Sequence, residues 1–388
     1  MTEASLKPGW RKWRFDQIAT NVNDRIDNPS ESDFEYYVGL EHIDPDSLKL
    51  HRWGSPSDVE ATKLIFRKGD IIFGRRRVYQ RKVAVAEFDG ICSAHALVLR
   101  AKPEIVLPEF LPFFMQSDQF MERAKTISIG SLSPTINWKT LAGEKFEIPS
   151  LIEQERICKR LIALEDLIIF YEKALHSASK ARKSLSLSLF NEDQKKHVEK
   201  LRKLILDSRY GPRFSSALYD ENGSIGQIRT TDMDDDGNID YLSVPKANLD
   251  IQDYEEHLLK DGDIVISRSG TCGITAIFSP QSEPIIPGAF LIRLRPNKKI
   301  SSEYLHEYFS SPLGRQLTAS LARGGVQKNI SGSELLAREV PCPDAERQKD
   351  VVVKLQDLKE AEKGLSERKF SLQTMKKLFL HSVVGDTV

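Results

Sequence analysis

The two halves of the chain repeat each other, and this repeat limits the possible folds more than any other feature. GDIIFGR at 69–75 returns as GDIVISR at 262–268, which is 193 positions later, and LPEFLPFFMQS at 107–117 corresponds to SSEYLHEYFSS at 301–311. Further on, GSLSPTIN (130–137) resembles GGVQKNIS (324–331) in residue type, and FEIPSLIEQERI (146–157) resembles REVPCPDAERQKDV (338–351). Four landmarks in the same order predict two similar domains.

Each half follows one plan. Short runs of β-branched and aromatic residues between Gly, Pro, Asn and Asp predict a region of strands and loops. A helical stretch rich in Phe, Tyr and Leu follows, then a Gly/Ser loop, a short strand that ends at Pro149 or Pro341, and a long helix. We therefore predict an α+β fold, in which two duplicated mixed α/β domains (1–150 and 196–343) are joined by two long helices (151–195 and 344–388).

The long helices carry a heptad pattern. In the first, apolar residues recur in steps of four and three, with Ala178 among them, and only Arg182 breaks the pattern. In the second, one core position is apolar, while the other becomes polar at Glu362, Lys369 and Lys376. The predicted core positions are Ile157, Leu161, Leu164, Ile168, Tyr171, Leu175, Leu185, Leu189, Val351, Leu355, Leu358, Leu365, Leu372 and Phe379.

So narrow an apolar stripe has to pack on a partner, and the nearest one is the other helix. We predict an intramolecular antiparallel coiled coil. The alternative is two unrelated amphipathic helices, each docked on its own domain.

Charge does not identify a partner. The 388 residues include 56 basic and 56 acidic side chains, and neither predicted domain is basic as a whole, so contact with phosphate would depend on local clustering. The spacing of the four cysteines suggests neither a zinc site nor a disulfide framework. The first residues lack an apolar signal-peptide core, and no run approaches a membrane span, so we expect a cytoplasmic protein without a membrane partner.

The sequence lacks the motifs of the common catalytic sites. It contains no GxxxxGK[ST], GxGxxG, HExxH or [DNS]PP[YF]. The SxxK at Ser177–Lys180 lies in a predicted helix, and DMDDDGNID (232–240) lacks the Gly and Glu positions of an EF-hand and is typical of a solvated turn. We therefore expect no catalytic residue and no metal site, and a chain that binds rather than reacts.

The segment IIFGRRRVYQRK (71–82) is the strongest candidate for binding. An apolar strand stops at Gly74 and is followed by five basic residues and no acidic one. Arginine suits contact with phosphate and with guanine edges, whereas the alternative is a solvated hairpin with scattered ion pairs. The candidate contacts in this segment are Arg75, Arg76, Arg77, Tyr79, Arg81 and Lys82.

The equivalent segment of the second half, SRSGTCGIT, keeps one arginine and replaces the rest by small polar residues. Two recognition surfaces for different sequences would share one backbone scaffold and differ in their side chains, as these two segments do. The Gly/Ser loops are a second candidate surface, although each is equally consistent with an ordinary helix-to-strand connection. The further candidates are Arg268, Ser269, Thr271, Ser131, Ser133, Thr135, Asn137, Gln327, Lys328, Asn329 and Arg213, with Tyr210 and the RKWR at 11–14 weaker still.

These landmarks, given twice, resemble the specificity (S) subunit of type I restriction-modification systems over essentially the whole chain. The most specific piece is IPSLIEQERICKRL (148–161), which is close to the family's IPLPPLxEQxxI entry into its conserved helix. The second copy, VPCPDAERQKDVVVKL (340–355), departs from it by lacking the Glu before Gln348.

The resemblance implies two target-recognition domains, each of which reads one half of a bipartite, asymmetric target in double-stranded DNA. It implies a non-catalytic chain that binds two modification subunits, which use S-adenosylmethionine to methylate adenine, together with two restriction subunits that use ATP and Mg²⁺. The chain itself would bind no cofactor.

Helix length is compatible with this expectation. A helix of about 35 residues is roughly 50 Å long, which corresponds to about one and a half turns of DNA. A protein-interaction scaffold with two binding domains is the alternative function, and a stand-alone DNA-modifying enzyme is a third.

Overall fold

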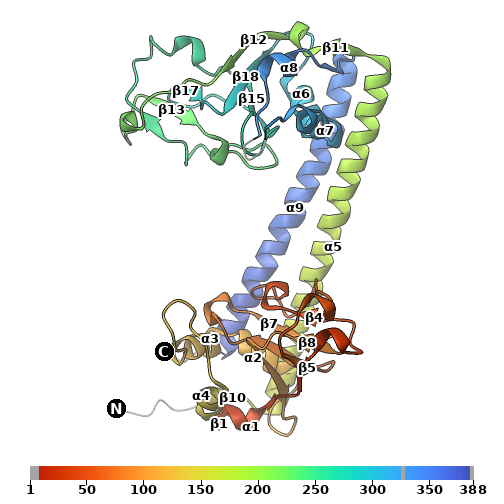
Figure 1. The fold of residues 1–388 in the computed structure, drawn as a ribbon, viewed down its shortest axis with the longest axis vertical. Helices are drawn as coiled ribbons and strands as arrows, with labels where there is room; N and C mark the ends of the chain where they lie inside the picture. The colour runs from red at the N-terminus through yellow and green to blue at the C-terminus, as the bar shows by residue number, and fades with distance from the viewer. Residues whose placement is uncertain (1–7, 325–327, 385–388) are drawn as a thin grey trace. The chain divides into compact units, whose positions relative to one another are not determined.

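The computed structural model describes residues 8–324 and 328–384, which divide into two compact units (Figure 1). Unit 1 is Met1–Glu172 with Glu367–Val388, and unit 2 is Lys173–Ser366. The long helices are α5 (Leu151–Lys196) and α9 (Ala345–Val384), so each unit contains a part of both. The division falls inside the helices because each globular part shares its apolar core with the helix segments of its own unit.

Unit 1 contains two four-stranded sheets and a strand pair. The first sheet is antiparallel, in the order β2 (Ala19–Val22), β9 (Ala96–Ala101), β6 (Ile71–Gly74) and β7 (Val83–Val85). The second has the order β3 (Arg25–Ile26), β5 (Lys63–Phe66), β8 (Gly90–Cys92) and β4 (Tyr37–Val38), with β4 and β8 parallel. The remaining elements are β1 (Arg11–Arg14) paired with β10 (Lys145–Ile148), and the helices α1 (Phe15–Ile18), α2 (Phe110–Gln116), α3 (Asp118–Thr126) and α4 (Trp138–Gly143).

Unit 2 repeats this arrangement. Its antiparallel sheet has the order β12 (Ile205–Tyr210), β18 (Leu291–Pro296), β15 (Ile264–Ser267) and β16 (Thr275–Ile277), which matches the order of β2, β9, β6 and β7. A second sheet again contains one parallel pair, in the order β14 (Lys246–Ala247), β13 (Ile225–Ile228) and β17 (Ile285–Pro287). The remaining elements are β11 (Val198–Lys200) paired with β19 (Glu339–Pro341), and the helices α6 (Ser302–Ser310), α7 (Pro312–Leu321) and α8 (Gly332–Leu336). The predicted duplicated α+β fold is confirmed.

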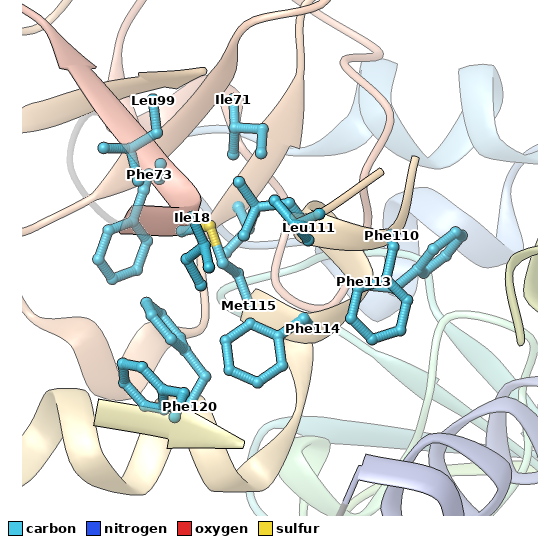
Figure 2. Close-up of a cluster of buried hydrophobic side chains, with 14 of the residues drawn as sticks. Ile18, Ile71, Phe73, Leu99, Phe110, Leu111, Phe113, Phe114, Met115 and Phe120 are labelled. Atoms are coloured by element: carbon cyan, nitrogen blue, oxygen red, sulfur yellow. The ribbon is translucent and has the colours of Figure 1, made fainter. Parts of the chain in front are cut away.

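The core of unit 1 lies between its first sheet and the helices that follow. Figure 2 shows Phe73 of β6, Leu99 of β9 and the side chains of α2 gathered into one cluster. Every residue of α2 is buried, which explains why this stretch is almost continuously apolar. Burying one such side chain contributes about 1.5–3 kcal/mol, so the cluster is a principal source of stability.

The repeated Gly-Asp is a turn before the central strand. Gly69 and Gly262 have φ angles of +91° and +75°, which favour glycine. The buried carboxylate of Asp70 accepts hydrogen bonds from the Arg67 N–H (2.8 Å) and from Arg100 Nε (2.7 Å). Asp263 makes the same bonds with the Lys260 N–H (2.8 Å) and Arg295 Nε (2.7 Å). The motif therefore closes the turn and ties it to the neighbouring strand of the sheet.

The long helices pack against each other within each unit, and none of the fourteen predicted core residues is fully exposed. Their ion pairs run in antiparallel order. In unit 1, Glu165 pairs with Lys376 (2.6 Å) and Glu172 pairs with Lys369 (3.7 Å). In unit 2, Arg182 pairs with Glu362 (3.0 Å) and Asp193 pairs with Arg347 (2.9 Å). Each polar residue that interrupts the heptads therefore has a partner on the other helix: Arg182 and Glu362 pair with each other, and Lys369 and Lys376 pair with glutamates beside core positions of α5.

Candidate nucleic-acid interface

In unit 1 the two predicted surfaces form a single one, because their backbones are hydrogen-bonded together. The Arg75 carbonyl accepts from the Ile136 N–H (2.9 Å), and the Pro134 carbonyl accepts from the Arg77 N–H (2.7 Å). Between these bonds, Arg76 faces Thr135 in a β-bridge. We call residues 75–82 and 129–137 loop pair 1.

Unit 2 repeats the first and third of these contacts at equivalent positions. The Arg268 carbonyl accepts from the Ile330 N–H (2.8 Å), and Ser269 faces Asn329 in a β-bridge. Arg323 and Asn329 exchange two backbone hydrogen bonds (3.0 and 2.8 Å), as Ile129 and Thr135 do in unit 1 (3.1 and 3.0 Å). We call the described residues of 268–273 and 323–330 loop pair 2. One scaffold thus carries both loop pairs.

The side chains of loop pair 1 are partly held by their neighbours. Arg76 donates from Nε to Ser133 Oγ (2.6 Å), and its Nη1 lies 3.4 Å from His95 Nε2. Burial and the adjacent Arg76 lower the pKa of His95, which favours a neutral imidazole that can accept from the guanidinium. Arg77 and Tyr79 are exposed. Arg76 is therefore held by hydrogen bonds, whereas the neighbouring Arg77 and the Tyr79 ring are exposed on the same loop.

Loop pair 2 is organised around Tyr210. The Arg268 guanidinium lies over the Tyr210 ring, 4.3 Å from its centroid, and the Tyr210 hydroxyl accepts from the Gly332 N–H (2.7 Å). A Cβ at position 332 would lie 2.9 Å from that hydroxyl oxygen, so glycine permits the contact. Tyr210 therefore connects Arg268 to the start of α8, two residues beyond the second segment of the pair. Thr271, Lys328 and Asn329 are exposed there, whereas Ser269 is buried.

Some of the predicted contact residues support the fold. Arg81 pairs with Asp46 (2.6 Å) and Asp118 (2.9 Å) and also donates to the Gln116 carbonyl, while Lys82 Nζ donates to the Leu40 carbonyl (2.5 Å). Asn137 caps α4, a helix not anticipated from the sequence, by accepting from the Lys139 N–H (3.1 Å).

The other predicted residues vary in their surroundings. The Thr135 hydroxyl donates to the Ser133 carbonyl (3.1 Å). Ser131 and Arg213 are exposed. Gln327 lies outside the described residues, and Arg11–Arg14 form strand β1.

His95 was not predicted, and Tyr210 was ranked among the weakest candidates. His95 is a single histidine between β8 and β9, and its place is occupied in unit 2 by Phe290, so no pattern distinguishes it. Tyr210 ends a strand 58 positions before Arg268, a separation that only the paired strands reveal.

The described residues of the loop pairs offer cationic, hydroxyl and amide groups. Over the described residues 8–324 and 328–384, no group of three or more His, Cys, Asp or Glu side chains is arranged to hold a metal ion. Within the same ranges, no helix is both long and apolar enough to cross a membrane.

Taken together, the duplicated fold and its paired loops define a protein with two equivalent loop surfaces of different composition. The family model for the type I restriction modification DNA specificity domain matches residues 57–177 and 203–369. These segments exceed half of the chain, and the chain belongs to this family, as its resemblance to specificity subunits led us to expect.

Curated relatives include specificity subunits of type I restriction enzymes. The chain is 27% identical to the EcoDI subunit of Escherichia coli over 48% of its own length and 41% of that relative. It is 25% identical to the MjaVIII subunit of Methanocaldococcus jannaschii (69% and 67% covered) and 23% identical to the EcoKI subunit of Escherichia coli strain K12 (82% and 77% covered). The chain thus spans less than half the length of the EcoDI subunit in that match.

Solved structures share the fold. A chain from a study of assembly and conformational transition of the type I R-M system aligns with a TM-score of 0.61 at 21% identity, over 99% of this chain and 100% of that one. The type I restriction-modification S subunit from M. genitalium aligns with a TM-score of 0.56 at 15% identity, over 99% of both chains.

Proposed function

We propose that this chain is the sequence-reading subunit of a type I restriction-modification complex, and that each unit reads one half of a bipartite target in double-stranded DNA. The observation that carries the proposal is the repeated loop pair, which keeps most of its backbone hydrogen bonds but changes its side chains between units. The exposed side chains are Arg77 and Tyr79 in unit 1, and Thr271 and Lys328 in unit 2. Different donors on one frame suit two different half-sites.

The proposal assigns the chemistry to partner subunits. Two modification subunits would methylate adenine with S-adenosylmethionine, and two restriction subunits would use ATP and Mg²⁺, while this chain binds no cofactor and supplies no catalytic residue. A complex of this kind would act in the cytoplasm, where the genome is. The lengths of α5 and α9 would set the gap between the half-sites.

Among the predicted contacts, we assign to DNA those of the loop pairs that are not buried and that neither pair with a carboxylate, nor cap a helix, nor donate to a carbonyl outside the loops. They are Arg75, Arg76, Arg77 and Tyr79 with Ser131, Ser133 and Thr135 in unit 1, and Arg268, Thr271, Lys328 and Asn329 in unit 2. Arg213 stays a predicted contact outside the loop pairs. Arg81, Lys82 and Asn137 would act indirectly, because their polar groups position the loops.

The proposal is tested by expressing the chain with the modification subunit from its own genome and sequencing the host DNA for N6-methyladenine. We expect methylation at one bipartite motif. Replacing Arg75, Arg76 and Arg77 together by alanine should relax or abolish recognition of one half-site and leave the other half unchanged. The outer-surface substitution Arg156→Gln, on α5, is the matched control for loss of a positive charge.

Two outcomes would contradict the proposal. Methylation that follows no sequence motif, or the absence of any methylation, would favour the protein-interaction scaffold. For a scaffold, the expected result is a complex that forms but does not bind duplex DNA. An unchanged motif in the triple variant would exclude the Arg75–Arg77 segment as a reader.

A further inference from the structure

Two arginines occupy the same position in the two loop pairs. Arg75 and Arg268 are each the first residue after the central strand of their sheet, β6 or β15. The Arg75 N–H donates to the His95 carbonyl (3.1 Å), and the Arg268 N–H donates to the Phe290 carbonyl (2.8 Å). Their own carbonyls accept from Ile136 and Ile330. Both backbones are therefore fixed on each side, at the base of the loop and not at its tip.

The side chains of these two arginines lack a counter-charge. The Nε atoms of Arg75 and Arg268 are shielded from solvent and have no hydrogen-bond partner, and among the described residues no carboxylate pairs with either guanidinium. Shielding alone does not distinguish them, because the Nε atoms of Arg209 and Arg293 are also buried and unpartnered. Those two guanidinium groups nevertheless pair through their Nη atoms, with Glu256 and Asp207. A partly buried cation is costly to leave unpaired, so an anion from outside the chain is the expected partner.

The residues that follow these arginines differ between the units. Arg76 and Arg77 in unit 1 correspond to Ser269 and Gly270 in unit 2. If the units read different half-sites, a residue kept at the same place in both has to contact what the half-sites share. The sugar-phosphate backbone is the feature that every DNA sequence presents.

We propose that Arg75 and Arg268 are equivalent phosphate anchors, which seat each unit on the DNA backbone, while the residues beyond them provide sequence discrimination. The inference rests on the proposed function and assigns backbone contact and sequence discrimination to different residues of the loop pairs. In unit 2 the Tyr210 ring stacks on the guanidinium and makes Tyr210 a positioning residue for this anchor.

The test measures binding of the chain, in complex with its modification subunit, to a random-sequence duplex and to the mapped target. Affinity is recorded by fluorescence anisotropy between about 50 and about 200 mM salt, because each phosphate contact adds about 0.9 to the slope of log K against log salt. Arg75→Gln and Arg268→Gln should each lower that slope by about 0.9. Each should also weaken both duplexes by about tenfold, the lower end for a hydrogen bond to a charged group.

Lysine variants separate a phosphate contact from a base contact. Lysine retains the charge but not the planar fork, so Arg75→Lys and Arg268→Lys should preserve the salt slope and most of the affinity. The exposed Arg156→Gln is again the control and should leave the slope unchanged. Thermal melting of each variant checks that it is folded, and a glutamine variant that melts early is replaced by Arg75→Met or Arg268→Met, which also removes the charge.

The result that would overturn the inference is a glutamine variant that keeps the slope, or one that binds the random duplex normally and loses affinity only for the target. A lysine variant that loses discrimination like the glutamine variant would also overturn it, because that pattern identifies a reader of base edges. If the wild-type complex binds neither duplex, the proposed function itself fails, and this outcome is distinct from the others.

Discussion

At the scale of single residues, the duplication preserves a small set of polar side chains that the fold requires. Gln154 accepts from the Leu107 N–H (2.7 Å) and donates to the carbonyls of Ile105 and Pro149 (both 2.9 Å). Gln348 makes the equivalent bonds to Ser301, Lys299 and Pro343 (each 2.8 Å). The Gln of the repeated helix-entry motif is therefore a buried connector between the helix start and the preceding segments.

Gln154→Leu should destabilise unit 1 by about 2–3 kcal/mol, because it leaves buried backbone groups without partners. All four tryptophans lie in unit 1, so urea unfolding followed by tryptophan fluorescence reports on this unit. The neighbouring substitution Glu155→Gln, at an exposed position of the same helix, is the control and should change the free energy of unfolding by less than about 0.5 kcal/mol. Equal stability of both variants would show that the three bonds are dispensable.

His306 of α6 should make unit 2 sensitive to acid. Its side chain is 7% exposed, and burial lowers its pKa to about 4. The unfolded chain therefore takes up this proton first as the pH falls, and the free energy of unfolding should decrease between about pH 6.5 and about pH 4, by up to about 3 kcal/mol. Burial raises the pKa of the adjacent Glu307 carboxyl, which acts in the opposite direction.

Comparison with His306→Gln isolates the histidine contribution. Hydrogen–deuterium exchange of residues 302–310 is the measurement, since unit 2 contains no tryptophan. The acid-dependent loss of protection should be smaller in the variant than in the wild type, and the same pH dependence in both proteins would contradict the assignment.

At the scale of elements, the polar residues of the helix pair explain its irregular heptads. Lys376 is 7% exposed, and its Nζ donates to Glu165 (2.6 Å) and to Gln116 Oε1 (3.1 Å). The sequence pattern identifies these positions as breaks in an apolar stripe. Only the packed helices show that each break is satisfied across the interface.

Lys376→Met should cost about 2 kcal/mol in unit 1, because it leaves the Glu165 carboxylate facing an apolar side chain. Adding Glu165→Leu should recover most of that loss, since replacing both members of a buried pair with apolar residues is often neutral. Urea unfolding of the single and double variants forms a double-mutant cycle. Additive losses would show that the two residues do not interact.

The sequence predicted these elements unevenly. The strands that contain GDIIF and GDIVIS and the two long helices were found because their patterns are long or repeated. Helices α4 and α8 were missed, because six and five residues give too short a period to detect. The loop residues were found as candidates, but the sequence did not separate Arg81, which is held by two carboxylates, from Arg77, which is exposed.

At the scale of the whole molecule, a net charge of zero is compatible with DNA binding, because the donors are concentrated in the loop pairs. The helices would then act as the spacer between half-sites. The proposed spacer role depends on the length of the two helices and not on the residues at their surface.

Removing one heptad from each helix, residues 173–179 of α5 and 363–369 of α9, should change the target or abolish methylation. Seven residues are about 10 Å of helix, which corresponds to about three base pairs. Methylome sequencing of a host that expresses the shortened chain with its modification subunit gives the gap directly. A wild-type gap would exclude the helices as the spacer.

The sequence by itself determined the duplication, the α+β class, the long helices and the family, because each is encoded by a pattern that recurs along the chain. Only the tertiary structure decided which donors are available to a partner. The Gly/Ser loop joins the arginine loop through backbone hydrogen bonds between distant segments, and nearby carboxylates neutralise Arg81 but not Arg75 or Arg268. Such pairings depend on proximity in space, which a linear pattern of residues does not contain.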